Sequence, residues 1–148
     1  MIEIKKNDFG YIDDYKNIYP VLVEKIKNIR RLRGDYITSE DEPADYSVKY
    51  SYMKGHTAKV LAITLSPTGC EWANQGGCSM CGEWEGSRKN DIVPSSFHIS
   101  QFKNSVNRLF PEYQPSWLRI YQEGNYTNTN EMELAAQLEI LRMAVQLP

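Results

Sequence analysis

The stretch from residue 60 to residue 81, VLAITLSPTGCEWANQGGCSMC, decides the fold of this chain. It begins with an apolar run, 60–65, whose β-branched side chains predict a buried strand. The three cysteines of the chain, Cys70, Cys78 and Cys81, all follow that strand in one loop. Glycines in the loop let the backbone fold back tightly, so that the soft thiolates can converge on one metal. The pattern predicts a metal site directly after a strand.

The number of cysteines indicates which kind of metal site the loop can form. Four thiolates would close a structural zinc or iron–sulfur site, whereas three leave one position for another ligand, as catalytic centres commonly do. A zinc site that recruits His56 or His98 stays an alternative, although neither histidine has the short spacing of structural zinc motifs. Each histidine alone is expected to be an ordinary surface residue or to support a site from behind. An odd number of cysteines disfavours disulfide pairing.

The spacing Cys-x7-Cys-x2-Cys after a strand resembles the cluster loop of radical S-adenosylmethionine (SAM) enzymes. The similarity is to the wide-spaced form in the elongator catalytic subunit and in archaeosine-synthase-type proteins. The neighbouring residues strengthen it, because the chain also has the family's flanking residues, Thr68-Gly69-Cys70, Gly77-Cys78 and Met80-Cys81-Gly82.

The resemblance continues in a second segment about forty residues further on. There an apolar run, 117–121, leads into the sequence Glu123-Gly124-Asn125 and on to Glu131. The segment is similar to the family's Gly-Ser-Phe-Leu-Asp-x-x-Glu. It departs from that pattern at three positions, Asn125, Tyr126 and Asn128.

The resemblance implies both cofactors and site residues. A [4Fe–4S] cluster would be held by Cys70, Cys78 and Cys81, and SAM would bind the remaining iron. Relatives contact the methionine part of SAM at the positions of Gly124 and Asn125, and Met80 would cover the cluster with an apolar side chain. The residues expected around the cofactors are Met80, Gly82, Glu123, Gly124 and Asn125. No catalytic side chain is identified.

The function implied is that of a radical SAM enzyme, or of its cluster-bearing fragment, which cleaves SAM reductively to start radical chemistry. An electron donor such as flavodoxin or ferredoxin is then required. Two kinds of substrate stay possible. One is a tRNA base, since the proteins that the loop resembles act on tRNA, and the other is a small molecule or peptide. The alternative is a non-catalytic zinc-binding or interaction module.

Periodicity predicts the elements around the cysteine loop. Helices are expected over about 12–33, 100–110 and 130–146, and a second strand over 117–122. Pro20 is expected to interrupt the first helix or to mark its start, and Pro111 to end the second. The acidic, tyrosine-rich segment 35–54 is expected to form an ordered loop.

Alternating strands and helices predict an α/β fold with parallel strands, whose carboxyl ends meet at one edge. The cysteine loop and the segment 123–125 should therefore converge. The resemblance implies the N-terminal portion of a partial (β/α)6 TIM-like barrel, with a helical extension over 1–55 and the first two β/α units over 56–148. Two units do not make such a barrel, so we expect a fragment that is completed by a missing C-terminal part or a second subunit.

Length, composition and charge limit the number of domains and the possible binding partners. A chain of 148 residues with 41% hydrophobic residues is long enough for one domain with a core. Its apolar runs are too short to cross a bilayer, and we expect a cytoplasmic protein. A net charge of −2 gives no general attraction to nucleic acid. The basic stretch 25–33 could touch phosphate, but a solvated helix face explains it more simply.

Overall fold

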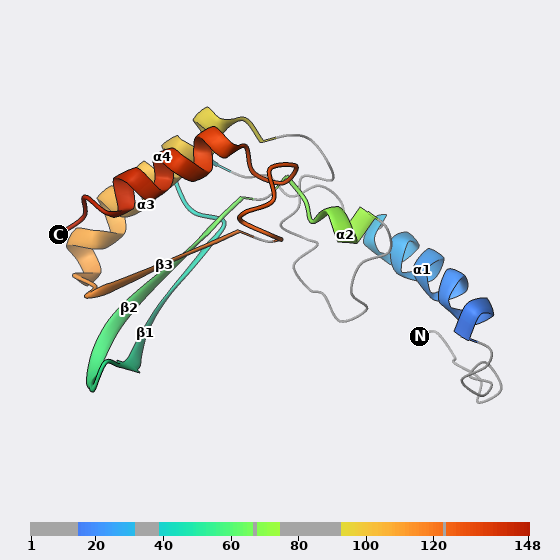
Figure 1. Cartoon of the computed structure of the whole chain (residues 1–148), viewed down its shortest axis with the longest axis horizontal. Coiled ribbons are helices and arrows are strands. Elements are labelled where there is room, and N and C mark those ends of the chain that lie inside the picture. Colours follow the sequence, from blue (N-terminus) through green and yellow to red (C-terminus); the bar gives the residue numbers. More distant parts are fainter. Residues whose placement is uncertain (1–14, 32–38, 67, 75–92, 123) are drawn as a thin grey trace.

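The computed structural model describes residues 15–31, 39–66, 68–74, 93–122 and 124–148. Figure 1 shows a curved sheet with two helices packed on one of its faces and a further helix extending away from it. The elements in chain order are α1 (Tyr15–Arg31), β1 (Asp45–Met53), β2 (His56–Leu65), α2 (Glu71–Asn74), α3 (Ser95–Tyr113), β3 (Trp117–Gln122) and α4 (Leu134–Ala144). No helix among the described residues has the length and apolar character needed to cross a membrane.

The sheet has the order β1-β2-β3 and is mixed. β1 and β2 form an antiparallel hairpin, while β2 and β3 run parallel. The hairpin turns at Lys54 and Gly55, whose φ angles are 48° and 86°. Two consecutive positive φ angles match the right-handed twist of paired strands, so a two-residue turn suffices.

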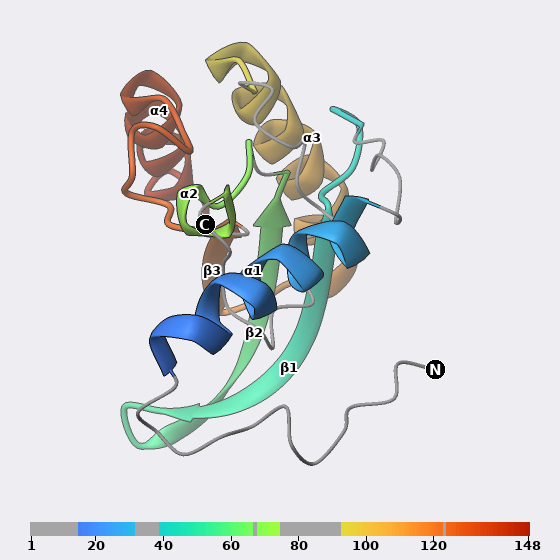
Figure 2. The ribbon, with the colours of Figure 1, turned by 90° about the vertical axis from the view of Figure 1, so that its right-hand side faces the viewer.

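The core lies between one face of the sheet and the helices α3 and α4 (Figure 2). Leu61, Ile63 and Leu65 alternate along β2 and are fully buried, because successive side chains of a strand point to opposite faces. From the helices, Phe102 and Ile140 are also fully buried. Each such side chain contributes roughly 1.5–3 kcal/mol to folding.

The expected portion of a (β/α)6 barrel was wrong. The described residues form a three-stranded mixed sheet in which β1 occupies one edge and pairs antiparallel with β2. Only the parallel pairing of the two expected strands is confirmed. The segment 35–54 was expected to be a loop, yet its residues 45–53 are β1. Since β1 pairs with β2, the sheet reaches back across the expected boundary at residue 55, and the division into 1–55 and 56–148 stays a prediction.

The helix limits also differ from expectation. α1 runs through Pro20, and α3 runs through Pro111 to Tyr113. Each proline removes one backbone hydrogen-bond donor, because both lie beyond the first four residues of their helices, yet the helix continues through it. α3 begins at Ser95 rather than near residue 100, which brings His98 into the helix, where it is buried.

A single glutamate connects the starts of α3 and α4. The Oε2 atom of Glu133 accepts hydrogen bonds from the amide nitrogen of Ser95, at 2.8 Å, and from the hydroxyl of Ser95. These hydrogen bonds hold the pKa of Glu133 below its ordinary value. The backbone of Glu133 is meanwhile the N-cap of α4. A carboxylate at the N-terminus of α3 also complements the dipole of that helix.

We expect Glu133→Gln to lower the melting temperature at pH 7, because the negative charge at the start of α3 is lost. A carboxylate with a lowered pKa in the folded state stabilises the fold above its unfolded pKa, near 4.5, and that stabilisation disappears as the pH falls through the folded pKa. The melting temperatures of wild type and variant, followed by circular dichroism, should therefore converge in acid. Glu40→Gln, at an exposed carboxylate, is the control. A difference between wild type and Glu133→Gln that stays constant down to about pH 3 would contradict this role.

Candidate functional site

The carboxyl ends of β2 and β3 bring two loops together. Leu65 and Gln122 are the last paired residues of these strands, and Cys70 and Gly124 follow them. A Cβ atom added at Gly124 would lie 3.5 Å from the Cα atom of Cys70. Cys70 and Gly124 are therefore neighbours, as the parallel strands predicted.

Glu131 holds the two loops against each other. Its side chain is buried, with the residue only 4% exposed. Its Oε1 atom accepts a hydrogen bond from the amide nitrogen of Glu71 at 2.8 Å, and its Oε2 atom accepts one from the amide nitrogen of Asn125 at 2.5 Å. Glu71 follows β2 and Asn125 follows β3. One carboxylate thus bridges the loops with charge-assisted hydrogen bonds, which are the stronger kind.

Asparagine side chains order the loop after β3. The Oδ1 atom of Asn125 accepts hydrogen bonds from the amide and the hydroxyl of Thr127, at 3.1 and 2.9 Å. The Nδ2 atom of Asn128 donates to Oε2 of Glu71 at 3.0 Å and to Oε1 of Glu131 at 3.2 Å. Such local side-chain bonds replace a regular backbone ladder. These hydrogen bonds therefore fix the conformation of the loop itself and not only the positions of its two ends.

A cavity of about 520 Å³ opens at this edge. Its lining residues come from both loops and are Cys70, Glu71, Trp72, Gly124, Asn125, Asn128 and Glu131. The volume is in the range of small-molecule sites. Cys70 is half-buried and carries a free thiol, so a soft metal ligand is present at the wall. The described part of this edge thus offers one thiol and, at Gly124, a position without a side chain.

Five of the expected site residues lie outside the described residues, namely Cys78, Met80, Cys81, Gly82 and Glu123. Their ligand roles stay predictions. Within the described part of the chain, no group of three His, Cys, Asp or Glu side chains is arranged to hold a metal ion.

Buried polar groups hold the residues that follow β2 and lead to Cys70. The Oε1 atom of Gln101 accepts a hydrogen bond from the amide nitrogen of Ser66 at 2.9 Å, and the Nε2 atom of His98 lies 2.7 Å from the carbonyl oxygen of Ser66. His98 is fully buried, so of the two expected roles, on the surface or in support of a site from behind, the surface role does not apply to it. Two residues further on, the hydroxyl of Thr68 accepts from the amide nitrogen of Val93 at 3.1 Å. α3 thus anchors the start of the cysteine loop.

Sequence reasoning did not select Glu131, Asn128 or Glu71 as site residues. Glu131 stands within the segment that resembles the family motif, so its position was visible, but its hydrogen bonds to a loop sixty residues earlier were not. The signal available was an acidic residue close to a cluster of asparagines after a strand, which is typical of a structured loop.

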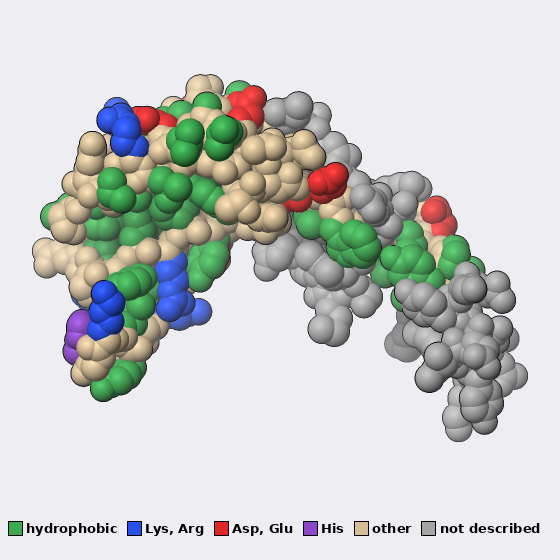
Figure 3. Space-filling model, viewed as in Figure 1, with side chains coloured by type: hydrophobic (Ala, Val, Ile, Leu, Met, Phe, Trp, Pro, Cys, Tyr) green, Lys and Arg blue, Asp and Glu red, His purple; other side chains and the backbone are tan. Residues whose placement is uncertain are grey.

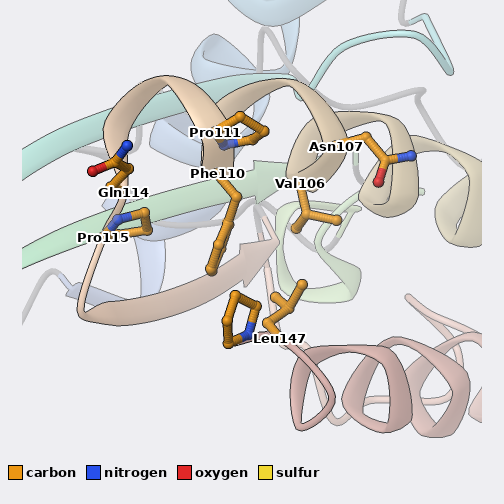
Figure 4. A pocket seen from close by; sticks show the side chains of 8 residues that line it. Val106, Asn107, Phe110, Pro111, Gln114, Pro115 and Leu147 are labelled. Atoms are coloured by element: carbon orange, nitrogen blue, oxygen red, sulfur yellow. The ribbon is translucent and has the colours of Figure 1, made fainter.

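A second cavity, of about 490 Å³, lies beside the last turn of α3 and the end of the described chain (Figure 4). Its lining residues are Val106, Asn107, Phe110, Pro111, Gln114, Pro115, Leu147 and Pro148. None of these side chains is ionisable. Because Pro115 precedes β3, this cavity lies near the edge where β3 begins, away from the cysteine loop.

No family model and no solved structure matches the chain. Among curated proteins, the chain is similar to the archaeosine synthase subunit beta of Methanosarcina acetivorans, with 24% identity over 110 residues. The match covers 73% of this chain and 31% of that protein. The chain thus spans less than a third of the length of this relative.

We expect Glu131→Gln to lower the free energy of unfolding by about 1–3 kcal/mol, because the amide nitrogen of glutamine cannot accept the hydrogen bonds that the lost oxygen accepts. Glu71→Gln is the matched control, since that carboxylate is exposed, and its cost should stay within about 0.5 kcal/mol. Urea titrations of the three proteins measure the difference. Equal stability of wild type and Glu131→Gln would show that the bridge is unimportant.

Gly124 and Gly55 form a second matched pair. Both have positive φ angles, 133° and 86°, so alanine at either position carries backbone strain of about 1–3 kcal/mol. A Cβ at Gly55 meets nothing within 4 Å, whereas one at Gly124 would collide with the carboxylate of Glu131. Gly124→Ala should therefore destabilise the protein by at least about 1 kcal/mol more than Gly55→Ala in the same urea titration. Equal losses of stability in the two variants would show that a side chain at residue 124 does not collide with Glu131.

Proposed function

We propose that this chain is the cluster-bearing part of a radical SAM enzyme. Cys70, Cys78 and Cys81 would hold a [4Fe–4S] cluster beside the cavity at the ends of β2 and β3. The observation that carries the proposal is the position of Cys70, which lies next to Gly124 on the wall of that cavity. The similarity to an archaeosine synthase subunit supports the same enzyme class.

The described residues have defined tasks in this proposal. The Cys70 thiolate would bind one iron, and the loop that carries it starts from a segment anchored by α3. The bound cluster would supply one electron for the reductive cleavage of SAM. Glu131 is a positioning residue, because it sets the distance between the two loops without needing to touch a cofactor.

The SAM side of the cavity would be formed by the loop after β3. Gly124 leaves space at the wall, and Asn125 lies beside it. The exposed carboxylate of Glu71 lines the same cavity and would attract the positive charges of SAM. We propose Gly82 and Glu123 as further contacts to the cofactors and Met80 as an apolar cover that limits the access of water.

The substrate we propose is a tRNA base. The relatives that the cluster loop resembles act on tRNA bases, and the matched protein is named an archaeosine synthase subunit. That name also supports a second subunit for this chain. An electron donor such as flavodoxin or ferredoxin would deliver the reducing electron.

Anaerobic purification and reconstitution should yield a brown protein with about four irons and a similar amount of sulfide per chain. Each of Cys70→Ala, Cys78→Ala and Cys81→Ala should lose the cluster, since every thiolate holds one iron. His56→Gln is the control and should keep its iron, because His56 lies at the opposite end of β2 from Cys70. Iron and sulfide assays with the visible spectrum measure the outcome.

The outcome that contradicts the proposal is a colourless protein with one zinc per chain. That result would favour the structural zinc-binding module instead. A cysteine variant that retains the full iron content would remove that residue from the ligand set. Release of 5′-deoxyadenosine from SAM after reduction with dithionite tests the cleavage step separately from cluster binding.

A further inference from the structure

The face of the sheet opposite α3 and α4 combines aromatic and basic side chains. In β3, Trp117, Arg119 and Tyr121 point to this side, since they pair with Val60, Ala62 and Thr64 rather than with the core residues Leu61, Ile63 and Leu65 of β2. All three are exposed, Trp117 to 38% and Tyr121 to 46%. On β1, Lys49 shares this side and is exposed as well. We call this surface the open face.

The centre of the open face is lined by small side chains. Along β2, between the two outer strands, these are Ala58, Val60, Ala62 and Thr64. Large side chains therefore rise from the outer strands over a low central strand. Such a surface suits a narrow, extended ligand that lies along the strands.

The charge of the open face is positive. Lys49 and Arg119 lie on it, and the ammonium of Lys54, from the hairpin turn, lies 5.9 Å from the ring centroid of Trp117. On the described part of this face, Asp45 is the one acidic residue, and it lies at the first position of β1, across β2 from Tyr121. The protein as a whole has a net charge of −2, so the positive charge here is local. Figure 3 shows Lys and Arg side chains over the strands, while the visible acidic side chains, with one further basic group beside them, lie over helical parts.

We propose that the open face binds single-stranded RNA. Bases stack on exposed aromatic side chains without requiring a particular sequence, and arginine between two aromatics adds both charge and stacking. Trp117 and Tyr121 lie four residues apart on one strand, roughly 13 Å, with Arg119 between them. The three cations near them complement the phosphates.

The hydroxyls on the open face favour RNA over DNA. Thr64 lies on β2 between Tyr121 and Asp45, Ser47 lies on β1 two residues before Lys49, and each is half-buried. A hydroxyl can exchange hydrogen bonds with a ribose 2′-OH, which DNA lacks. A protein partner is less well matched, because protein interfaces have apolar centres and lack concentrated charge of one sign. The choice of RNA also rests on the proposed function.

The test is binding of a fluorescein-labelled, eight-nucleotide RNA of mixed sequence to the full chain, followed by fluorescence anisotropy without SAM or reductant. Trp117→Ala and Tyr121→Ala should each weaken binding about 10-fold, and Trp117→Phe should restore most of it. Arg119→Gln should reduce the slope of log K against log salt by about 0.7. Tyr52→Ala is the matched control, since Tyr52 is 78% exposed but lies on the other face of the same sheet. Lys103→Gln, on α3, is the control for charge.

Three outcomes overturn the proposal. These are the absence of binding, an equal loss in Tyr52→Ala, and equal affinity for a DNA oligomer of the same sequence. Far-ultraviolet circular dichroism of each variant separates lost binding from lost folding. Iron is measured in the same preparations, so that failure of RNA binding is distinguished from failure of the proposed cluster.

Discussion

The geometry of the site depends on the buried carboxylate of Glu131. Strand pairing between β2 and β3 ends at Leu65 and Gln122, so pairing alone leaves the two following loops unconnected. Glu131 connects them by accepting the amide hydrogens of Glu71 and Asn125. Moving this carboxylate would remove the charged acceptor of two partly buried amides, and a hydrogen bond to a charged group contributes about 1.5–3 kcal/mol. The distance between the cysteine loop and the loop after β3 is therefore a property of the protein before any cofactor binds.

The bridge formed by Glu131 explains why residue 124 is a glycine without reference to a cofactor. The family resemblance explains a glycine at this position by the close approach of a cofactor. The structure supplies a reason within the chain, because a side chain at Gly124 would collide with the carboxylate of Glu131. The two reasons are compatible, but the glycine alone is weak support for a cofactor. The position of Cys70 on the cavity wall is stronger support, since nothing in the described fold requires a thiol there.

The sequence predicted what depends on local pattern and missed what depends on tertiary contact. The strands that precede Cys70 and Gly124 were readable because buried parallel strands form continuous apolar runs. β1 was missed although Tyr46, Val48, Tyr50 and Tyr52 alternate along it, because its polar residues resembled those of a loop. The barrel was inferred from motifs, and motifs describe loops rather than the number of strands. The role of Glu131 could not be predicted, since one of its partners is a backbone amide sixty residues away.

The strand β3 relates the two proposed sites. Its alternate residues contribute to the core on one side and to the open face on the other, and the strand ends immediately before the loop of Gly124. Tyr121 is therefore the last open-face residue before the cavity, three positions from Gly124 along the chain. An RNA strand stacked along β3 would run toward the cavity rather than away from it, because the parallel strands direct both at the same edge. This arrangement would let one short strand hold the proposed substrate and place it next to the proposed cofactors.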